Sequence, residues 1–66
     1  MKIKDIVDNY YIKIYKLDRD IFSESIYGRI LYKGNARKIY SDDILNCDIF
    51  KIFEYDNLGH TVVVVE

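Results

Sequence analysis

The end of the chain places four consecutive valines, Val62 to Val65, in a segment of strand-like composition. Successive side chains of a β-strand point to opposite faces, so Val62 and Val64 face one way while Val63 and Val65 face the other. A chain of 66 residues has little material for covering both faces of a sheet, because a domain of this size buries only about 60% of its unfolded surface. The sequence therefore predicts either a sheet that curls into a small barrel or a second face that meets another chain.

Domains this small usually need a disulfide, a metal or self-association for stability. Cys47 is the single cysteine, which excludes an internal disulfide, and His60 is the single histidine. One cysteine and one histidine do not provide the ligand spacing of a zinc site. Self-association remains, so we expect a homo-oligomer without cofactor or metal; a monomer with an efficiently packed core is the alternative.

Hydrophobic periodicity predicts four strands, over residues 10–17, 21–32, 48–55 and 60–66, and a short N-terminal helix over 3–9. Residues 17–20, 33–35 and 56–59 carry turn signals. Ser41 is a suitable N-cap for one helical turn over 41–45. The prediction is a single domain, 1–66, of the α+β or mostly β class. It contains a small antiparallel sheet of about four strands in two hairpins, with the helical turn between the hairpins and a curled barrel as one possible form.

Catalytic motifs are absent from the sequence. It has no G-x-S-x-G nucleophile elbow, no phosphate-binding loop and no dinucleotide-binding glycine pattern. Cys47 and His60 lie on neighbouring predicted strands and are a formal nucleophile–base pair, but a lone cysteine is commonly a small buried hydrophobe. Asp42 and Asp43 are adjacent at the predicted start of a helix, where acidic residues stabilise the helix N-terminus. Adjacent residues of a helix do not face each other, so we do not expect the two carboxylates to act as an acid–base pair. We therefore expect a protein that binds and does not catalyse.

Charge is balanced overall but uneven along the chain. Ten basic and eleven acidic residues give a net charge of −1, which argues against binding of bulk DNA or RNA. Residues 29–38 carry four basic residues and no acid, whereas residues 41–56 carry five acids and Lys51 alone. A locally basic segment in a neutral protein suits a small anion. The acidic stretch suits mimicry of nucleic acid toward a protein partner.

Tyrosines alternate with basic residues along the chain, and seven tyrosines in 66 residues is a high proportion. A ring beside an ammonium or guanidinium group can hold a base and its phosphate together. The alternative explanation is composition, because strands favour tyrosine and an AT-rich coding sequence enriches it. The candidate ligand-binding residues are Tyr11, Lys13, Tyr27, Arg29, Tyr32, Lys33, Arg37 and Lys38.

The start of the chain, Met1 to Asp5, lacks the apolar stretch of a signal peptide, and no apolar run is long enough to span a membrane. With a single cysteine, this predicts a cytoplasmic protein without membrane contact.

The layout resembles that of small proteins encoded by phages and prophages of low-GC Gram-positive bacteria. The resemblance lies in the amphipathic start (residues 2–7), the strand and tight turn (12–18), the short helical turn (41–45) and the final hairpin (49–65). It implies an anti-defence role, in the host cell cytoplasm, through sequestration of a small nucleotide signal at an oligomer interface. The alternatives are a protein–protein inhibitor of a host defence complex such as a CRISPR effector, and a structural or regulatory phage component without a ligand.

Overall fold

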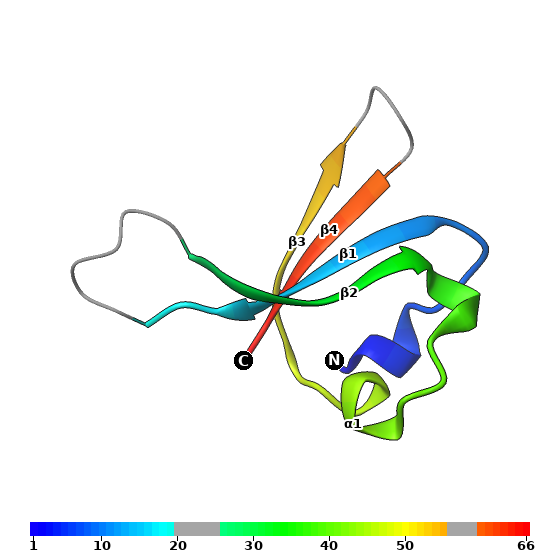
Figure 1. The fold of residues 1–66 in the computed structure, drawn as a ribbon, viewed down its shortest axis with the longest axis horizontal. Helices are drawn as coiled ribbons and strands as arrows, with labels where there is room; N and C mark the ends of the chain where they lie inside the picture. Colours follow the sequence, from blue (N-terminus) through cyan, green and yellow to red (C-terminus); the bar gives the residue numbers. More distant parts are fainter. Residues whose placement is uncertain (20–25, 56–59) are drawn as a thin grey trace.

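The computed structural model describes residues 1–19, 26–55 and 60–66 (Figure 1). Two short 3-10 turns and one α-helical turn accompany four strands in this part of the chain. The elements are η1 (Ile3–Asp5), β1 (Tyr11–Leu17), β2 (Tyr27–Asn35), η2 (Ala36–Lys38), α1 (Asp42–Leu45), β3 (Ile49–Tyr55) and β4 (His60–Val65). The α+β, mostly β class and the two hairpins, β1–β2 and β3–β4, are confirmed.

The four strands form one sheet in the order β2-β1-β4-β3. Each hairpin is antiparallel, but β1 and β4, which join the hairpins at the centre, run parallel. The sheet is therefore mixed, and the prediction of an antiparallel sheet is wrong at this central pair. Hairpin turns dictate antiparallel pairing only within a hairpin, whereas the pairing of β1 with β4 depends on how the two hairpins pack.

The sheet coils strongly but does not close into a barrel. In the described strands β2 and β3 remain separate edges, and the two hairpins cross when viewed down the shortest axis of the molecule (Figure 1). Register shifts in both hairpins increase the local twist. In the first hairpin β2 has extra residues opposite Ile14–Leu17 of β1, and in the second β3 has one between Ile49 and Lys51. The barrel alternative is thus replaced by an open, coiled sheet.

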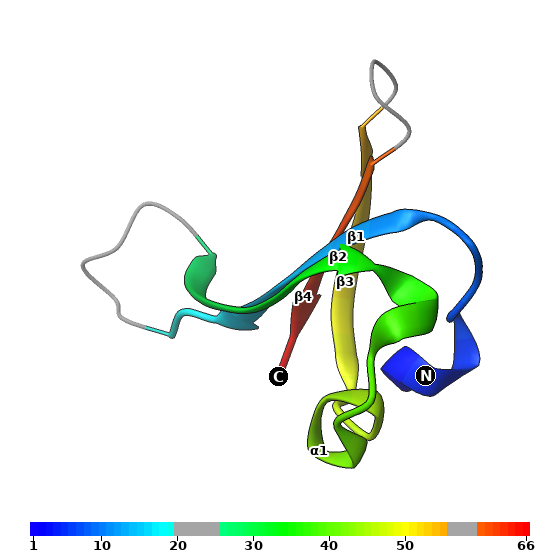
Figure 2. The ribbon, with the colours of Figure 1, turned by 45° about the vertical axis from the view of Figure 1, so that its right-hand side comes forward.

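One face of the sheet, termed the core face, carries Ile12, Ile14, Val63 and Val65, all fully buried. The turns η1, η2 and α1 lie together on this side in both views (Figures 1 and 2). They contribute buried Ile3, Ala36 and Ile39 to the same cluster. An isolated bridge between Lys2 and Asp48 fastens the start of the chain to the segment before β3. The short helical elements therefore act as a cover for one side of the central strand pair.

The second face of the sheet also buries its valines within the single chain. Val62 is 2% exposed and Val64 is fully buried, although none of the turns covers this side. Their register neighbours are Lys13 and Phe53 for Val62, and Tyr15 and Lys51 for Val64. The inference that these valines require a second copy of the chain therefore fails, because both are already buried within one chain. Homo-oligomerisation itself stays a prediction.

Local elements differ from the predictions where long-range pairing overrides local signals. The N-terminal helix is only the 3-10 turn η1, and residues 33–35, predicted as a turn, continue β2 as partners of β1. The helical turn α1 is confirmed, and the Ser41 hydroxyl accepts a hydrogen bond from the Ile44 amide at 3.5 Å. The first part of the predicted second strand and the predicted turn over 56–59 lie outside the described residues.

Candidate functional site

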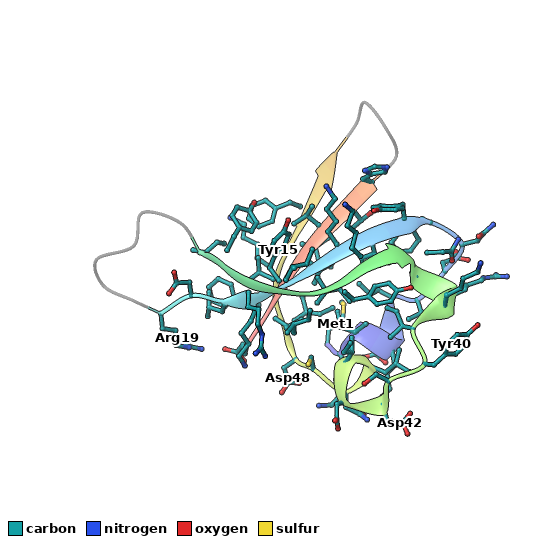
Figure 3. The ribbon with its side chains drawn as sticks, viewed as in Figure 1. Met1, Tyr15, Arg19, Tyr40, Asp42 and Asp48 are labelled. Atoms are coloured by element: carbon teal, nitrogen blue, oxygen red, sulfur yellow. The ribbon has the colours of Figure 1, made fainter. Side chains whose placement is uncertain are left out.

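The face opposite the core face gathers rings and amines. Strand register assigns its members, because residues paired across neighbouring strands point to the same side of a sheet. In Figure 3, Tyr15 lies on this side, whereas Met1, Asp42 and Asp48 lie on the side of α1. None of the strand positions assigned to this face carries a carboxylate. We call it the aromatic–lysine face, after its ring and amine side chains: Tyr11, Lys13, Tyr15, Tyr27, Lys33, Lys51, Phe53 and His60. Register places Leu17, Ile30, Asn35, Val62 and Val64 on the same side.

Two lysines lie directly opposite each other on this face. Lys13 of β1 is the register partner of Lys33 of β2, in an antiparallel pair. Opposite residues in such a pair have Cβ atoms about 4.5–5.5 Å apart, and like charges at this position are unfavourable. Neither ammonium group forms an ion pair with any residue that the structure describes. The pair therefore concentrates positive charge that an anion would neutralise.

A stacked ring pair lies next to the lysines. Tyr11 and His60 are register partners on the parallel strands β1 and β4, and their ring centroids are 4.2 Å apart with an interplanar angle of 27°. Both side chains are half-buried. Tyr11 precedes Lys13 by two residues, so the strand rise places it about 6.6 Å from Lys13 on the same face. A planar ligand that reaches these rings thus also reaches the amines.

The other rings of the face join its two edges. Tyr27 of β2 makes an edge-on contact with Tyr15 at 5.2 Å and a tilted contact with Phe53 of β3 at 5.8 Å. In a flat sheet, strands three positions apart are separated by about 14 Å, so these rings bridge the two edge strands across this face. The Lys51 ammonium lies 5.0 Å from the Phe53 ring centroid, which is a cation–π distance. By register, Phe53 neighbours Val62 and Tyr15 neighbours Val64.

The structure brings some of the predicted site residues together and separates others. Tyr11, Lys13, Lys33 and Tyr27 share the aromatic–lysine face. Tyr32 is the register partner of Ile14 and therefore points to the core face, where it packs against the core and donates its hydroxyl proton to the Asn35 carbonyl at 2.7 Å.

The remaining three predicted residues are exposed and lie at the periphery. Arg29 falls in the irregular stretch between the paired positions Tyr27 and Ile30. Arg37 and Lys38 lie in η2, just beyond the end of β2. The Arg37 guanidinium is 3.3 Å from the Asp8 carboxylate, in a solvent-exposed ion pair that contributes little to stability.

Sequence reasoning missed four members of this face: Tyr15, Lys51, Phe53 and His60. The period-two alternation of Tyr11, Lys13 and Tyr15 was available as a signal for Tyr15. His60 was not predictable in this way, because its contact with Tyr11 exists only through the parallel pairing of β1 and β4. Lys51 and Phe53 reach the face because the register shift in β3 places Ile49 and Ile52 on the core side.

The Cys47–His60 pair does not assemble. His60 pairs with Tyr55 at one end of the β3–β4 hairpin, whereas Cys47 precedes β3 at the other end, eight residues or about 26 Å away by strand rise. The Cys47 thiol instead donates to the Asp43 carbonyl at 3.2 Å. Among the described residues, no three His, Cys, Asp or Glu side chains gather in a way that could hold a metal ion. None of the helices in this part of the chain has the length and apolarity needed to cross a membrane.

Comparison with known proteins gives no relative from which a function could be inferred, so the interpretation of the site rests on the structure of this chain. No protein-family model, curated protein or solved structure matches the sequence or fold significantly.

Proposed function

We propose that this chain is a non-enzymatic binding protein that holds a small nucleotide on the aromatic–lysine face. The observation that carries the proposal is the Lys13–Lys33 couple, which has no ion-pair partner among the described residues, beside the stacked Tyr11–His60 rings. The amines supply charge for a phosphate, and the rings supply a surface for a base. The face offers too few cations for a polymer, in keeping with a net charge of −1.

The resemblance to phage proteins extends the proposal to a biological role. A protein that binds a nucleotide signal without consuming it lowers the free concentration of that signal. We therefore propose that the chain counters host defence by sequestration. Such a role needs a stoichiometric amount of protein and high affinity, but no catalytic group.

Calorimetry with the four 5′-mononucleotides tests the binding site. We expect the double variant Lys13→Gln, Lys33→Gln to lose about tenfold or more in affinity, corresponding to about 1.4 kcal/mol. The control is Lys4→Gln, Lys16→Gln, which removes the same charge from exposed positions outside the face and should bind like the wild type. Absence of binding to all four mononucleotides and to dinucleotides would refute the proposal, as would equal losses in both double variants.

The alternative function, inhibition of a host defence protein by direct contact, is favoured by a different surface. The free edge strand β3 exposes Phe50 by 49% and Ile52 by 40%, and exposed apolar side chains on an open edge are typical of protein contacts. The same edge is where self-association would occur. Native mass spectrometry separates these cases, because it reports the number of subunits, a retained nucleotide and a bound partner in one measurement.

A further inference from the structure

The aromatic–lysine face has a linear order along β1. Tyr11, Lys13 and Tyr15 alternate on one side of this strand, so a cation lies between two rings. With a rise of about 3.3 Å per residue, neighbouring members are about 6.6 Å apart and the two tyrosines about 13 Å apart. A ligand that follows the strand would meet ring, charge and ring in this sequence.

Each of these three side chains has a side chain of the same kind, a ring or an amine, beside it on a neighbouring strand. His60 of β4 stacks on Tyr11 at 4.2 Å, Lys33 of β2 lies opposite Lys13, and Tyr27 of β2 contacts Tyr15 at 5.2 Å. The register shifts in the β1–β2 hairpin flank Tyr15, and shifts of this kind re-aim side chains. The face thus holds one ring pair at Tyr11 and a second at Tyr15, whose partner Tyr27 also contacts Phe53, with the lysine couple between the two pairs.

A mononucleotide has one base and would occupy one ring pair and the lysines, leaving the other ring pair without a ligand. The second pair is reachable, since Tyr15 is half-buried and Tyr27 is 37% exposed. Two nucleosides joined through a phosphodiester present base, phosphate and base, which is the order on the strand.

Resting on the proposed function, we propose that the ligand of this face is a dinucleotide. One base stacks on the Tyr11–His60 ring pair, the linking phosphate lies between Lys13 and Lys33, and the second base stacks on Tyr15, whose ring meets Tyr27 edge-on. The ligand is bound with its bases apart and not stacked on each other, because the ring pairs are about 13 Å apart along β1.

Calorimetry on the full-length protein with two matched probe sets tests this assignment. The first set contains the four 5′-mononucleotides and the second the four homodinucleoside monophosphates, each with a single 3′,5′-linked phosphate. The mononucleotide carries more charge, so a purely electrostatic site would prefer it. A site with two ring pairs should bind the best dinucleoside monophosphate about tenfold more tightly than the matching mononucleotide.

The variant Tyr15→Leu tests whether the second base binds at the Tyr15–Tyr27 ring pair. It keeps an apolar side chain over Val64 and removes the ring, so it should weaken dinucleoside binding about tenfold and leave mononucleotide binding within twofold. Tyr40→Leu is the matched control, because Tyr40 is 85% exposed and lies beyond η2, away from Tyr15 (Figure 3). It should change neither affinity.

The outcomes separate the two proposals. If neither probe set binds the wild type, the nucleotide function itself fails. If mononucleotides bind and the dinucleoside monophosphates bind no more tightly, the function stands and the dinucleotide assignment is overturned. A loss of both affinities in Tyr15→Leu, with a preserved circular dichroism spectrum, would also overturn the assignment, because it would place both probes on one ring pair. The wild-type comparison decides the matter even if the variant does not fold.

Discussion

Replacing Val64 by alanine tests whether this residue of the aromatic–lysine face is buried by its own chain and not by a second copy. Val64 is fully buried in the single chain, beside Tyr15 of β1 and Lys51 of β3. The substitution removes two buried carbon groups, at about 0.8 kcal/mol each, and leaves a partly unfilled cavity. We expect a loss of about 2–3 kcal/mol in the free energy of unfolding. Val63→Ala, on the core face, should cost a similar amount.

The size of this loss matters for so small a protein. At roughly 0.05–0.15 kcal/mol per residue, a chain of 66 residues has a total stability of about 3–10 kcal/mol. A loss of 2–3 kcal/mol would lower the melting temperature by more than about 10 °C. Urea unfolding followed by circular dichroism measures the change, and Ile52→Val, at a 40% exposed edge position, is a control that should cost well under 1 kcal/mol.

Protein concentration provides the decisive comparison. If a second chain covered Val64, the stability of the wild type would rise with concentration, and the loss in Val64→Ala would grow with it. If the rings of the same chain cover it, the loss is the same at all concentrations. A loss below about 1 kcal/mol for Val64→Ala beside a loss of about 2–3 kcal/mol for Val63→Ala would refute the reasoning that Val64 is packed within its own chain.

Three further predictions concern the scaffold. Gly28→Ala should destabilise the β1–β2 hairpin by about 1–3 kcal/mol in urea unfolding, because a Cβ atom would lie 2.6 Å from the Lys16 carbonyl oxygen; a neutral effect would contradict this close approach. Burial, and to a smaller extent the Asp8 carboxylate, raise the pKa of Tyr10 above 10.0, so the folded state keeps this proton to a higher pH than the unfolded chain. The contribution of the protonated Tyr10 hydroxyl to the free energy of unfolding is complete below pH 10 and is lost as the pH rises through the folded-state pKa. Tyr10→Phe should therefore flatten the dependence of stability on pH in this range, and an unchanged slope would contradict the argument. Ser41→Ala should cost about 0.5–1 kcal/mol by thermal unfolding, since it removes the cap of α1, and it should leave nucleotide affinity unchanged.

The lysine pair that would favour anion binding lowers the stability of the folded chain. Lys13 and Lys33 repel across the β1–β2 hairpin, and no described carboxylate offsets this repulsion. Such local conflicts are typical of binding sites, where the ligand supplies the missing partner. An anion bound between the amines would therefore stabilise the hairpin as well as occupy the site.

Properties that depend on neighbouring residues alone were determined by the sequence. The period of two in β1 and the four valines of β4 identify strands that bury apolar side chains, because this alternation follows from the backbone geometry of a strand. The Ser41 cap and the interleaving of Tyr11 with Lys13 are local in the same sense. The mostly β class, the two hairpins and part of the candidate site were predictable on this basis.

Properties that depend on which strands meet were decided only by the tertiary structure. The parallel pairing of β1 with β4 brings His60 onto Tyr11, although the two residues are far apart in the chain. The register shifts in β2 and β3 determine which side chains leave the core face, and the coil of the sheet carries Tyr27 across to Phe53. Local periodicity contains no information about partners, bulges or coiling, because these arise from packing between distant segments.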